Sequence, residues 1–331
     1  MPRGRPKKSQ IESSKIIEVE NDKKEDYEIK QEEKKVILTD KEKKTNVVLR
    51  ELNKSLGGEF LKPASQVLQR ERLPFKQFNL NKLTGGGIPY GTFTTIYGSK
   101  GCSKTTIAYN LISEAQKRGD ICLYADIERS YDPIWAKKCG VDVDKLIYGA
   151  FYLAEQPLDV IIKICKEKAI QFVVVDSING LSPKNEQIQG KTKERSVEDD
   201  SMALIARKLS QFFRMAVSYV AEAKCAVLLI GQSRMDLGSF IKLETLSGGH
   251  ALLHYSRLIL KVRRGQGAEA PTEKVDETTD DVDKDGNPVV KKVEKKVGFD
   301  LVVKVEKSQI DGCVENEEVH MQFYYTEGIK D

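Results

Sequence analysis

A short segment rich in glycine and serine carries the residues of this chain that are best suited to chemistry. Gly98–Thr106 follows the apolar run Phe93–Tyr97 and contains the pair Lys104 and Thr105. The pattern predicts a strand, a phosphate-sized loop and a helix, in which backbone N–H groups surround phosphates, the lysine reaches the β/γ oxygens and the hydroxyl holds Mg²⁺. It indicates a nucleoside triphosphate as ligand, and a Gly/Ser turn with a chance Lys-Thr pair is the alternative. The predicted nucleotide-binding residues of this loop are Gly98, Ser99, Lys100, Gly101, Cys102, Ser103, Lys104, Thr105 and Thr106.

One position departs from the usual form of such a loop. Ser103 stands directly before the lysine, where the consensus has glycine. Glycine accepts a positive φ without steric cost, whereas serine does not. We therefore expect Ser103 to bear on how fast the nucleotide is turned over.

Two acidic residues follow apolar strands and could serve this loop. Asp176 ends the run Phe172–Val175 about seventy residues after the loop, as expected of a Walker B carboxylate that holds Mg²⁺ through water. A second strand, Ile121–Asp126, leads to Glu128 at the sheet edge where such folds bind ligands. A carboxylate there can orient and deprotonate an attacking water, and a surface glutamate in a loop is the alternative.

The elements that would position these residues alternate along the chain. Alternation of short apolar strands with helical patterns predicts an α/β fold, a mainly parallel twisted sheet with helices on both faces. The predicted strands are Thr94–Tyr97, Ile121–Asp126, Ile147–Tyr152, Phe172–Asp176 and Ala226–Ile230, and the predicted helices begin at Lys104, Pro133 and Pro157 or span Ser201–Ala223. Phe299–Lys307 and His320–Tyr325 are predicted to return to the sheet.

Composition predicts how the chain is organised around this core. Residues 1–45, rich in charge and nearly free of aromatics, are predicted to be a disordered tail. Residues 46–82 are predicted to hold an amphipathic helix, stopped by Gly57-Gly58, and a linker that dock a neighbouring protomer. Residues 83–331 are predicted to be the nucleotide-binding core, with a flexible hairpin or linker inserted at 266–297. The aspartates of that insertion imitate a calcium loop, but Lys292 at its twelfth position argues against calcium.

The overall composition excludes several classes of protein. The net charge is +4 over 331 residues, and the six cysteines form no CxxC pair or metal-ligand spacing. No run of eighteen apolar residues is present, and the basic N-terminus lacks an apolar stretch after it. We therefore expect reduced cysteines, no membrane partner and a cytoplasmic location.

The N-terminal tail contains a basic motif of its own. Pro2–Lys8 has an Arg-Gly-Arg-Pro core that resembles the AT-hook, which lies in the narrow minor groove of A·T-rich DNA. A basic solubilising or targeting tail is the alternative, and the sequence leaves both open.

Five ordered motifs together resemble the RecA family of bacterial DNA strand-exchange ATPases. They are Gly98–Thr106, Tyr124–Pro133, Phe172–Ser177, Leu229–Met235 and Ser247–Leu252. The resemblance covers roughly residues 80–265 and 298–330. It implies a RecA-like P-loop NTPase core that uses ATP and Mg²⁺, binds single-stranded DNA, forms a helical homo-filament and pairs the strand with a homologous double-stranded DNA.

The resemblance also assigns roles at the nucleotide. It implies that Glu128 is the catalytic carboxylate and that Gln232 senses the γ-phosphate and signals to the adjacent DNA-binding loop. It implies that Asp132 accepts from the adenine amine, and that Trp135 and Tyr325 enclose the base. Lys104 and Lys307 complete the implied catalytic set, with Lys307 reaching a neighbour's ATP, and Thr105 and Asp176 would hold the metal.

Two loops of the family face the filament axis and hold single-stranded DNA. Here they correspond to Lys184–Met202 and Arg234–Gly249. Basic residues would contact phosphates, Met202 and Leu237 would insert between bases, and two glycines would offer backbone N–H groups. The implied DNA-binding residues are Lys191, Lys193, Arg195, Met202, Arg207, Arg214, Arg234, Leu237, Gly248 and Gly249.

Departures from the family pattern limit these expectations. Asp236 and Leu253 stand where the family has basic residues, and Gln309 replaces the second interface lysine. The first DNA loop is several residues longer, and the chain stops where a C-terminal duplex-binding domain would begin. We expect the basic tail to take over duplex capture, an organisation that would suit a bacteriophage recombinase.

The resulting prediction is an ATP-dependent homologous recombinase that polymerises head to tail on single-stranded DNA, with single-strand-binding and loader proteins as further partners. Two alternatives stay open: a hexameric DNA helicase built on the same core, and a hydrolysis-impaired, ATP-dependent DNA-binding filament. Ser103 and Gln309 motivate the last of these, and Glu128 argues against it.

Overall fold

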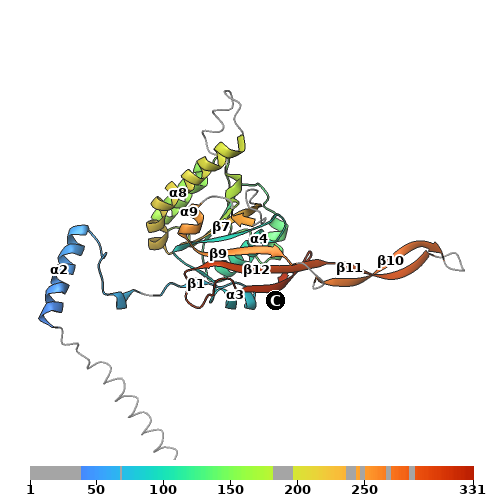
Figure 1. The fold of residues 1–331 in the computed structure, drawn as a ribbon, viewed down its shortest axis with the longest axis horizontal. Coiled ribbons are helices and arrows are strands. Elements are labelled where there is room, and N and C mark those ends of the chain that lie inside the picture. The colour runs from blue at the N-terminus through green and yellow to red at the C-terminus, as the bar shows by residue number, and fades with distance from the viewer. Residues whose placement is uncertain are drawn as a thin grey trace, which may run out of the picture. The chain divides into compact units, whose positions relative to one another are not determined.

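The computed structural model describes residues 39–67, 69–181, 197–235, 244–246, 250–265, 270–282 and 288–331. The chain divides into two compact units, Met1–Gln69 and Arg70–Asp331 (Figure 1). The second unit contains every described residue that the sequence places at the nucleotide.

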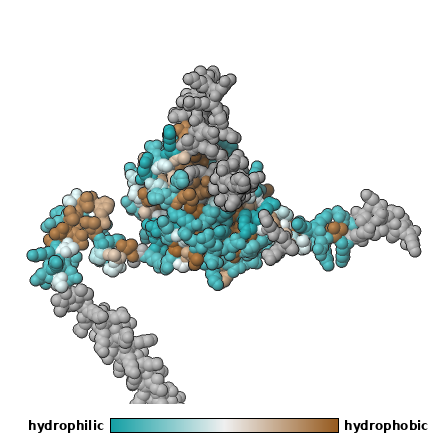
Figure 2. Space-filling model, in the orientation of Figure 1, coloured by the Kyte–Doolittle hydropathy of each residue, from teal (hydrophilic) through white to brown (hydrophobic). Residues whose placement is uncertain are grey.

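The described part of the first unit is built around helix α2, Asp40–Leu56, followed by the 3-10 turn η1, Ala64–Gln66. The helix begins six residues before residue 46, the first residue that the sequence analysis placed after the disordered tail. It begins there because Thr39 and Glu42 form a reciprocal capping box. It ends as predicted at Gly57, which has φ 74°. Val47, Val48, Leu52 and Leu56 are exposed on it, and Figure 2 shows apolar residues along this helix.

The second unit is organised by a mixed sheet of ten described strands in the order β14-β13-β12-β9-β3-β7-β6-β4-β5, with β8 paired to β7 (Figure 1). One part of the sheet is parallel and consists of β9, β3, β7, β6, β4 and β5. The sheet continues from β9 with three antiparallel strands, β12, β13 and β14. The strands are β3 (Thr92–Gly98), β4 (Cys122–Asp126), β5 (Ile147–Ala150), β6 (Phe172–Asp176), β7 (Ala226–Met235), β8 (Glu244–Leu246), β9 (Ser256–Arg264), β12 (Gly298–Ser308), β13 (Glu318–Tyr324) and β14 (Gly328–Lys330).

Helices cover both faces of this sheet, which confirms the predicted α/β class. Along β6, Val174 belongs to one hydrophobic cluster with α4, whereas Val173 and Val175 belong to the opposite cluster with α6 and α8. The described helices of the unit are α3 (Phe78–Leu83), α4 (Lys104–Lys117), α5 (Pro133–Lys138), α6 (Glu155–Lys166), α8 (Val197–Ala223) and α9 (His250–Tyr255), with the short turn η2 (Ile178–Gly180). Strands β1 (Arg72–Leu73) and β2 (Ile88–Pro89) form a separate pair. Among the described residues, no helix combines the length and apolarity that crossing a membrane requires.

The insertion predicted at 266–297 contains a long antiparallel hairpin, β10 (Thr272–Val282) and β11 (Pro288–Lys296) (Figure 1). Opposite charges face each other across it, as at Glu273 and Lys295, and Lys295 also forms an ion pair of 3.0 Å with Glu277. The sequence analysis left a hairpin and a linker open for this insertion, and such cross-strand pairs favour the hairpin.

A histidine on the antiparallel side of the sheet gives the fold a pH dependence. His320 Nδ1 lies 2.9 Å from Asp300 Oδ2, and its Nε2 lies 3.5 Å from Glu318 Oε1. The hydrogen bond with Asp300 raises the pKa of His320 above its ordinary 6.5, partial burial opposes this, and the charges of both carboxylates add to the rise. The protonated ring therefore stabilises the fold below about pH 6.5, and this contribution is lost as the pH rises through the folded-state pKa.

We predict that His320→Asn lowers the melting temperature more at pH 6 than at pH 8, by a small margin because half of the His320 side chain is exposed. Thermal melts of both proteins at the two pH values measure this difference. His254→Asn is the control, since His254 contacts the ring of Tyr255 and forms no ion pair in the described part of the chain. An equal loss at both pH values for His320→Asn would contradict the assignment.

Candidate nucleotide-binding site

The loop between β3 and α4 has the backbone that a phosphate-binding loop needs. Gly98 packs so closely on β9 that a Cβ atom would lie 1.9 Å from the carbonyl oxygen of Val262. Gly101 has φ 75°, and Ser103, directly before α4, has φ 67°. Ser103 thus adopts the left-handed conformation that glycine would take at this position, so the departure from consensus does not change the path of the loop.

Ser103 nevertheless carries a conformational cost, and we predict that Ser103→Gly raises the free energy of unfolding by up to about 1 kcal/mol. A left-handed conformation costs an L-residue about 1–2 kcal/mol, and glycine removes this cost from the folded state. The greater conformational freedom of glycine in the unfolded chain offsets about half of the resulting stabilisation. Urea denaturation measures the change. Ser130→Gly is the matched control, because Ser130 does not have a positive φ and should lose stability. A loss in both variants would show that Ser103 is unstrained.

Lys104 is held inside the loop that it is predicted to serve. Its side chain is buried, and Nζ donates to the carbonyl oxygens of Gly98 (3.0 Å) and Ser99 (2.7 Å). The Cys102 thiol lies 3.7 Å from the same nitrogen and donates to the Ser99 carbonyl at 2.9 Å. Among the described residues, the partners of this ammonium are two carbonyl oxygens and a thiol, none of them an anion, which suits a group that receives phosphate oxygens.

The predicted metal ligands lie together. Thr105, in the first turn of α4, donates from Oγ1 to Asp176 Oδ2 at 2.7 Å, and the Tyr124 hydroxyl donates to the same oxygen at 2.7 Å. Burial raises the pKa of Asp176, the two hydroxyl donors lower it, and the nearby charges of Glu128 and Asp126 raise it further. A hydroxyl and a desolvated carboxylate among further negative charges form a set of hard oxygen donors, so the residues present fit Mg²⁺.

The predicted catalytic carboxylate is hydrogen-bonded to two strands. Glu128 Oε1 accepts from the Ser177 hydroxyl, which follows β6, and from Gln232 Nε2 on β7 at 2.8 Å. The backbone N–H of Gln232 donates to Asn179 Oδ1 at 2.7 Å. Gln232 therefore contacts the carboxylate directly, although the two residues are 104 positions apart in the sequence. The sequence analysis predicted that the Gln232 side chain contacts the γ-phosphate, and it did not predict the hydrogen bond to Glu128.

A cavity of about 300 Å³ lies against the phosphate loop. It is lined by Gly101, Ser103, Lys104, Thr105, Arg264, Phe299, Phe323 and Tyr325. Tyr325 is half exposed, and its ring centroid lies 6.1 Å from that of Phe299 and from that of Phe323. An aromatic wall beside a phosphate loop suits a nucleobase, as predicted for Tyr325.

Arg264 is a cavity residue that the sequence analysis did not identify. Its Nε and Nη2 donate to the carbonyl oxygen of Gly101 at 3.1 and 2.8 Å, and its guanidinium lies 4.2 Å from the ring centroid of Phe299. Arg264 lies at the end of β9, and its contact with Gly101 depends on the pairing of β9 with β3, which the sequence did not indicate.

The other predicted base contacts lie at the start of α5. Asp132 Oδ1 caps this helix by accepting from the backbone N–H groups of Ile134 (2.9 Å) and Trp135 (3.0 Å). Trp135 donates from Nε1 to Thr106 Oγ1 at 3.1 Å and lies 6.2 Å from the ring of Phe323. Trp135 thus contacts the phosphate loop and the aromatic wall, but it does not line the cavity that contains Tyr325.

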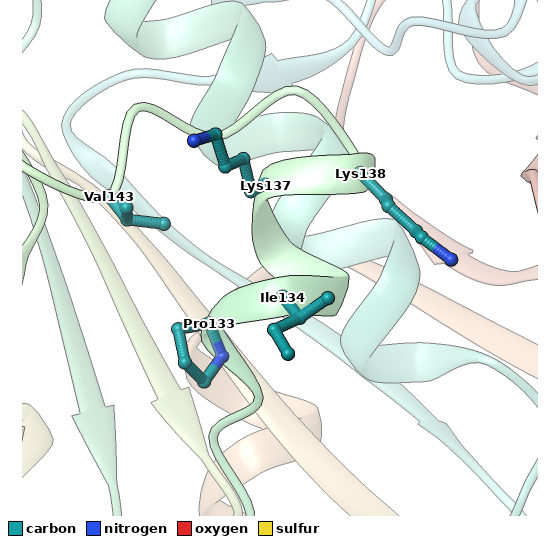
Figure 3. A pocket seen from close by; sticks show the side chains of 5 residues that line it. All are labelled: Pro133, Ile134, Lys137, Lys138 and Val143. Atoms are coloured by element: carbon teal, nitrogen blue, oxygen red, sulfur yellow. The ribbon is translucent and has the colours of Figure 1, made fainter.

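A second cavity, of about 450 Å³, lies on α5 and is lined by Pro133, Ile134, Lys137, Lys138 and Val143 (Figure 3). It shares no lining residue with the cavity at the phosphate loop. The chemistry-bearing residues therefore favour the smaller cavity as the nucleotide site.

Lys307 makes its contacts within its own chain. Its Nζ donates to the carbonyl oxygens of Leu253 (2.5 Å) and His254 (3.3 Å) in α9 and of Ser256 (2.9 Å) at the start of β9. Burial lowers the pKa of Lys307. The contact across a subunit interface that the resemblance implies for Lys307 stays a prediction.

Most of the predicted DNA contacts lie outside the described residues. These are Lys191, Lys193, Arg195, Leu237, Gly248 and Gly249, and the side chains of Met202 and Arg234 are likewise not described although their backbones lie in α8 and β7. Arg207 and Arg214 are both exposed on α8 and lie seven residues apart, hence on one side of the helix.

Comparison with known proteins places this site in a family. The model of the RecA N-terminal domain matches residues 43–285 of the chain. The chain belongs to the RecA family. The expected family and the RecA-like α/β core are thereby confirmed.

Curated RecA proteins align with much of the chain. Protein RecA of Ruegeria pomeroyi is 38% identical over 180 residues, which cover 54% of this chain and 50% of that protein. Protein RecA of Agrobacterium fabrum is 35% identical over 230 residues, covering 68% and 62%. Protein RecA of Mannheimia haemolytica is 32% identical over 293 residues, covering 87% and 72%. The chain thus spans only 50% of the first of these relatives and 62% of the second.

Proposed function

We propose that this chain is an ATP-dependent homologous recombinase, which polymerises on single-stranded DNA and pairs it with a homologous duplex in a bacterial cell. The observation that carries the proposal is the hydrogen bond between Glu128 and Gln232. Gln232 lies on β7, which ends at Met235, the second residue of the second predicted DNA loop. This bond supports a direct link between the hydrolytic carboxylate and DNA binding.

The proposed binding step uses residues of the phosphate loop. Lys104 exchanges the Gly98 and Ser99 carbonyls for phosphate oxygens, and Arg264 keeps the Gly101 peptide oriented. Thr105 and Asp176 would hold Mg²⁺, which when bound neutralises charge on the phosphates. The aromatic wall with Tyr325 takes the base.

The proposed hydrolysis step uses Glu128 as the general base. Its carboxylate orients a water molecule and accepts a proton from it as the water attacks the terminal phosphate. The bonds from Ser177 and Gln232 fix the carboxylate in one orientation. In this proposal the Gln232 side chain responds to the terminal phosphate and acts on the predicted DNA loop that begins at the end of β7, so that the ATP-bound state favours DNA binding and hydrolysis releases the DNA.

The proposed assembly is a head-to-tail helical filament, as expected of a heterologous interface that does not close. Exposed Arg207 and Arg214 support a DNA-facing side of α8. The homologous duplex, single-strand-binding proteins and loader proteins remain proposed partners. Lys307 is proposed to act on a neighbour's ATP.

Electron microscopy of the protein on single-stranded DNA with a slowly hydrolysed ATP analogue tests this proposal. We expect helical filaments that are absent with Lys104→Ala, because that variant lacks the cation for the phosphates. Closed rings would instead support the hexameric helicase, and filaments without ATP turnover would support the hydrolysis-impaired alternative.

A further inference from the structure

Tyr124 on β4 makes a contact with the metal-site carboxylate that the proposed mechanism does not use. The side chain is fully buried, and its hydroxyl donates to Asp176 Oδ2 at 2.7 Å. The same oxygen accepts from Thr105 at 2.7 Å. Among the described residues, these two hydroxyls are the side-chain donors to Asp176.

The two donors differ in what else they can do. Thr105 lies in the first turn of α4 and lines the cavity, so its hydroxyl is accessible to a ligand there. Tyr124 lies in the sheet, its ring packed 5.5 Å from that of Tyr109 and 5.4 Å from that of Tyr131. If Thr105 turns its hydroxyl towards Mg²⁺, the Tyr124 hydroxyl remains in place as a donor to Asp176.

We propose that Tyr124 is a positioning residue for the metal site: it holds Asp176 in the orientation that accepts Mg²⁺ when Thr105 leaves the carboxylate. This inference rests on the proposed function, since it takes Asp176 and Thr105 as the metal-holding pair. Tyr124 itself does not touch metal or nucleotide; it acts through Asp176. A carboxylate whose orientation is fixed before binding loses less freedom when the metal arrives.

The chain offers a matched control in the same aromatic cluster. Tyr109 on α4 is also buried, and its hydroxyl lies near that of Tyr124, but among the described residues it donates no hydrogen bond to Asp176. Phenylalanine therefore removes an equivalent hydroxyl at each position, with a contact to Asp176 in one case and without one in the other. Both substitutions preserve the ring and its packing.

The test is a Mg²⁺ titration of fluorescent ADP binding, with Tyr124→Phe, Tyr109→Phe and the unaltered protein. We expect Tyr124→Phe to raise the Mg²⁺ concentration for half-maximal binding by roughly tenfold, because a hydrogen bond to a charged group is lost. Tyr109→Phe should leave it unchanged. Nucleotide binding in excess chelator, which does not use the metal, should be equal in all three proteins.

Two results would overturn the inference: an unchanged Mg²⁺ requirement in Tyr124→Phe, or an equal loss of nucleotide affinity with and without Mg²⁺, which would assign Tyr124 to packing alone. Failure of the proposed function looks different, since the unaltered protein would then not bind the nucleotide at any Mg²⁺ concentration. Thermal melting without ligand verifies that both variants are folded.

Discussion

Glu128→Gln is expected to slow DNA-stimulated ATP hydrolysis by about 10²–10⁴-fold while leaving nucleotide binding in place. The amide oxygen of glutamine can still accept from Ser177 and Gln232, so the local structure is retained and only the ability to take a proton is lost. Phosphate release under saturating ATP and single-stranded DNA measures the rate, and fluorescent-nucleotide anisotropy measures binding.

The control for Glu128→Gln is Glu114→Gln, which neutralises a glutamate that is paired with Lys117. Its hydrolysis rate should remain that of the unaltered protein. If Glu128→Gln kept more than about a tenth of the rate, Glu128 would not be the general base.

Gly98→Ala is expected to destabilise the α/β unit by roughly 3–5 kcal/mol, at the upper end for a single substitution. The added methyl would lie 1.9 Å from the Val262 carbonyl oxygen and 3.0 Å from Cys102 Sγ. The Val262 oxygen belongs to the backbone of β9, which pairs with β3 and cannot move alone. The melting temperature should fall by about 10 °C or more.

Gly119→Ala separates the clash at Gly98 from the general cost of replacing a glycine. Gly119 has φ 86°, and nothing lies within 4 Å of its added Cβ, so only backbone strain of about 1 kcal/mol is expected. Equal losses in Gly98→Ala and Gly119→Ala would show that β9 relaxes away from the loop.

The places of several candidate site residues in the fold could be predicted from local patterns in the sequence. Gly98–Thr106, Asp176 and Glu128 were identifiable because each follows an apolar strand, and parallel strands deliver their ends to one edge of a sheet. The structure brings Thr105 to Asp176 and Gln232 to Glu128. The α/β class followed from the same alternation.

The contacts that sequence reasoning missed depend on tertiary pairing. Arg264 reaches Gly101 only because β9 pairs with β3, and no local sequence pattern predicts that these two strands are neighbours. The Tyr124 hydroxyl bonds Asp176 across the pairing of β4 with β6. The start of α2 at Asp40 was missed for another reason. The capping box of Thr39 and Glu42 was visible in the sequence, but it lies within residues 1–45, which were predicted to be disordered because of their high charge.

The most direct test of the central claim is pairing of a labelled single strand with a homologous duplex, measured with ATP, with a slowly hydrolysed analogue and with Lys104→Ala. The account predicts pairing with ATP and with the analogue, because filament binding energy drives exchange, and no pairing with Lys104→Ala. Strand separation under ATP alone, without pairing under either nucleotide, would contradict a recombinase and identify a motor helicase.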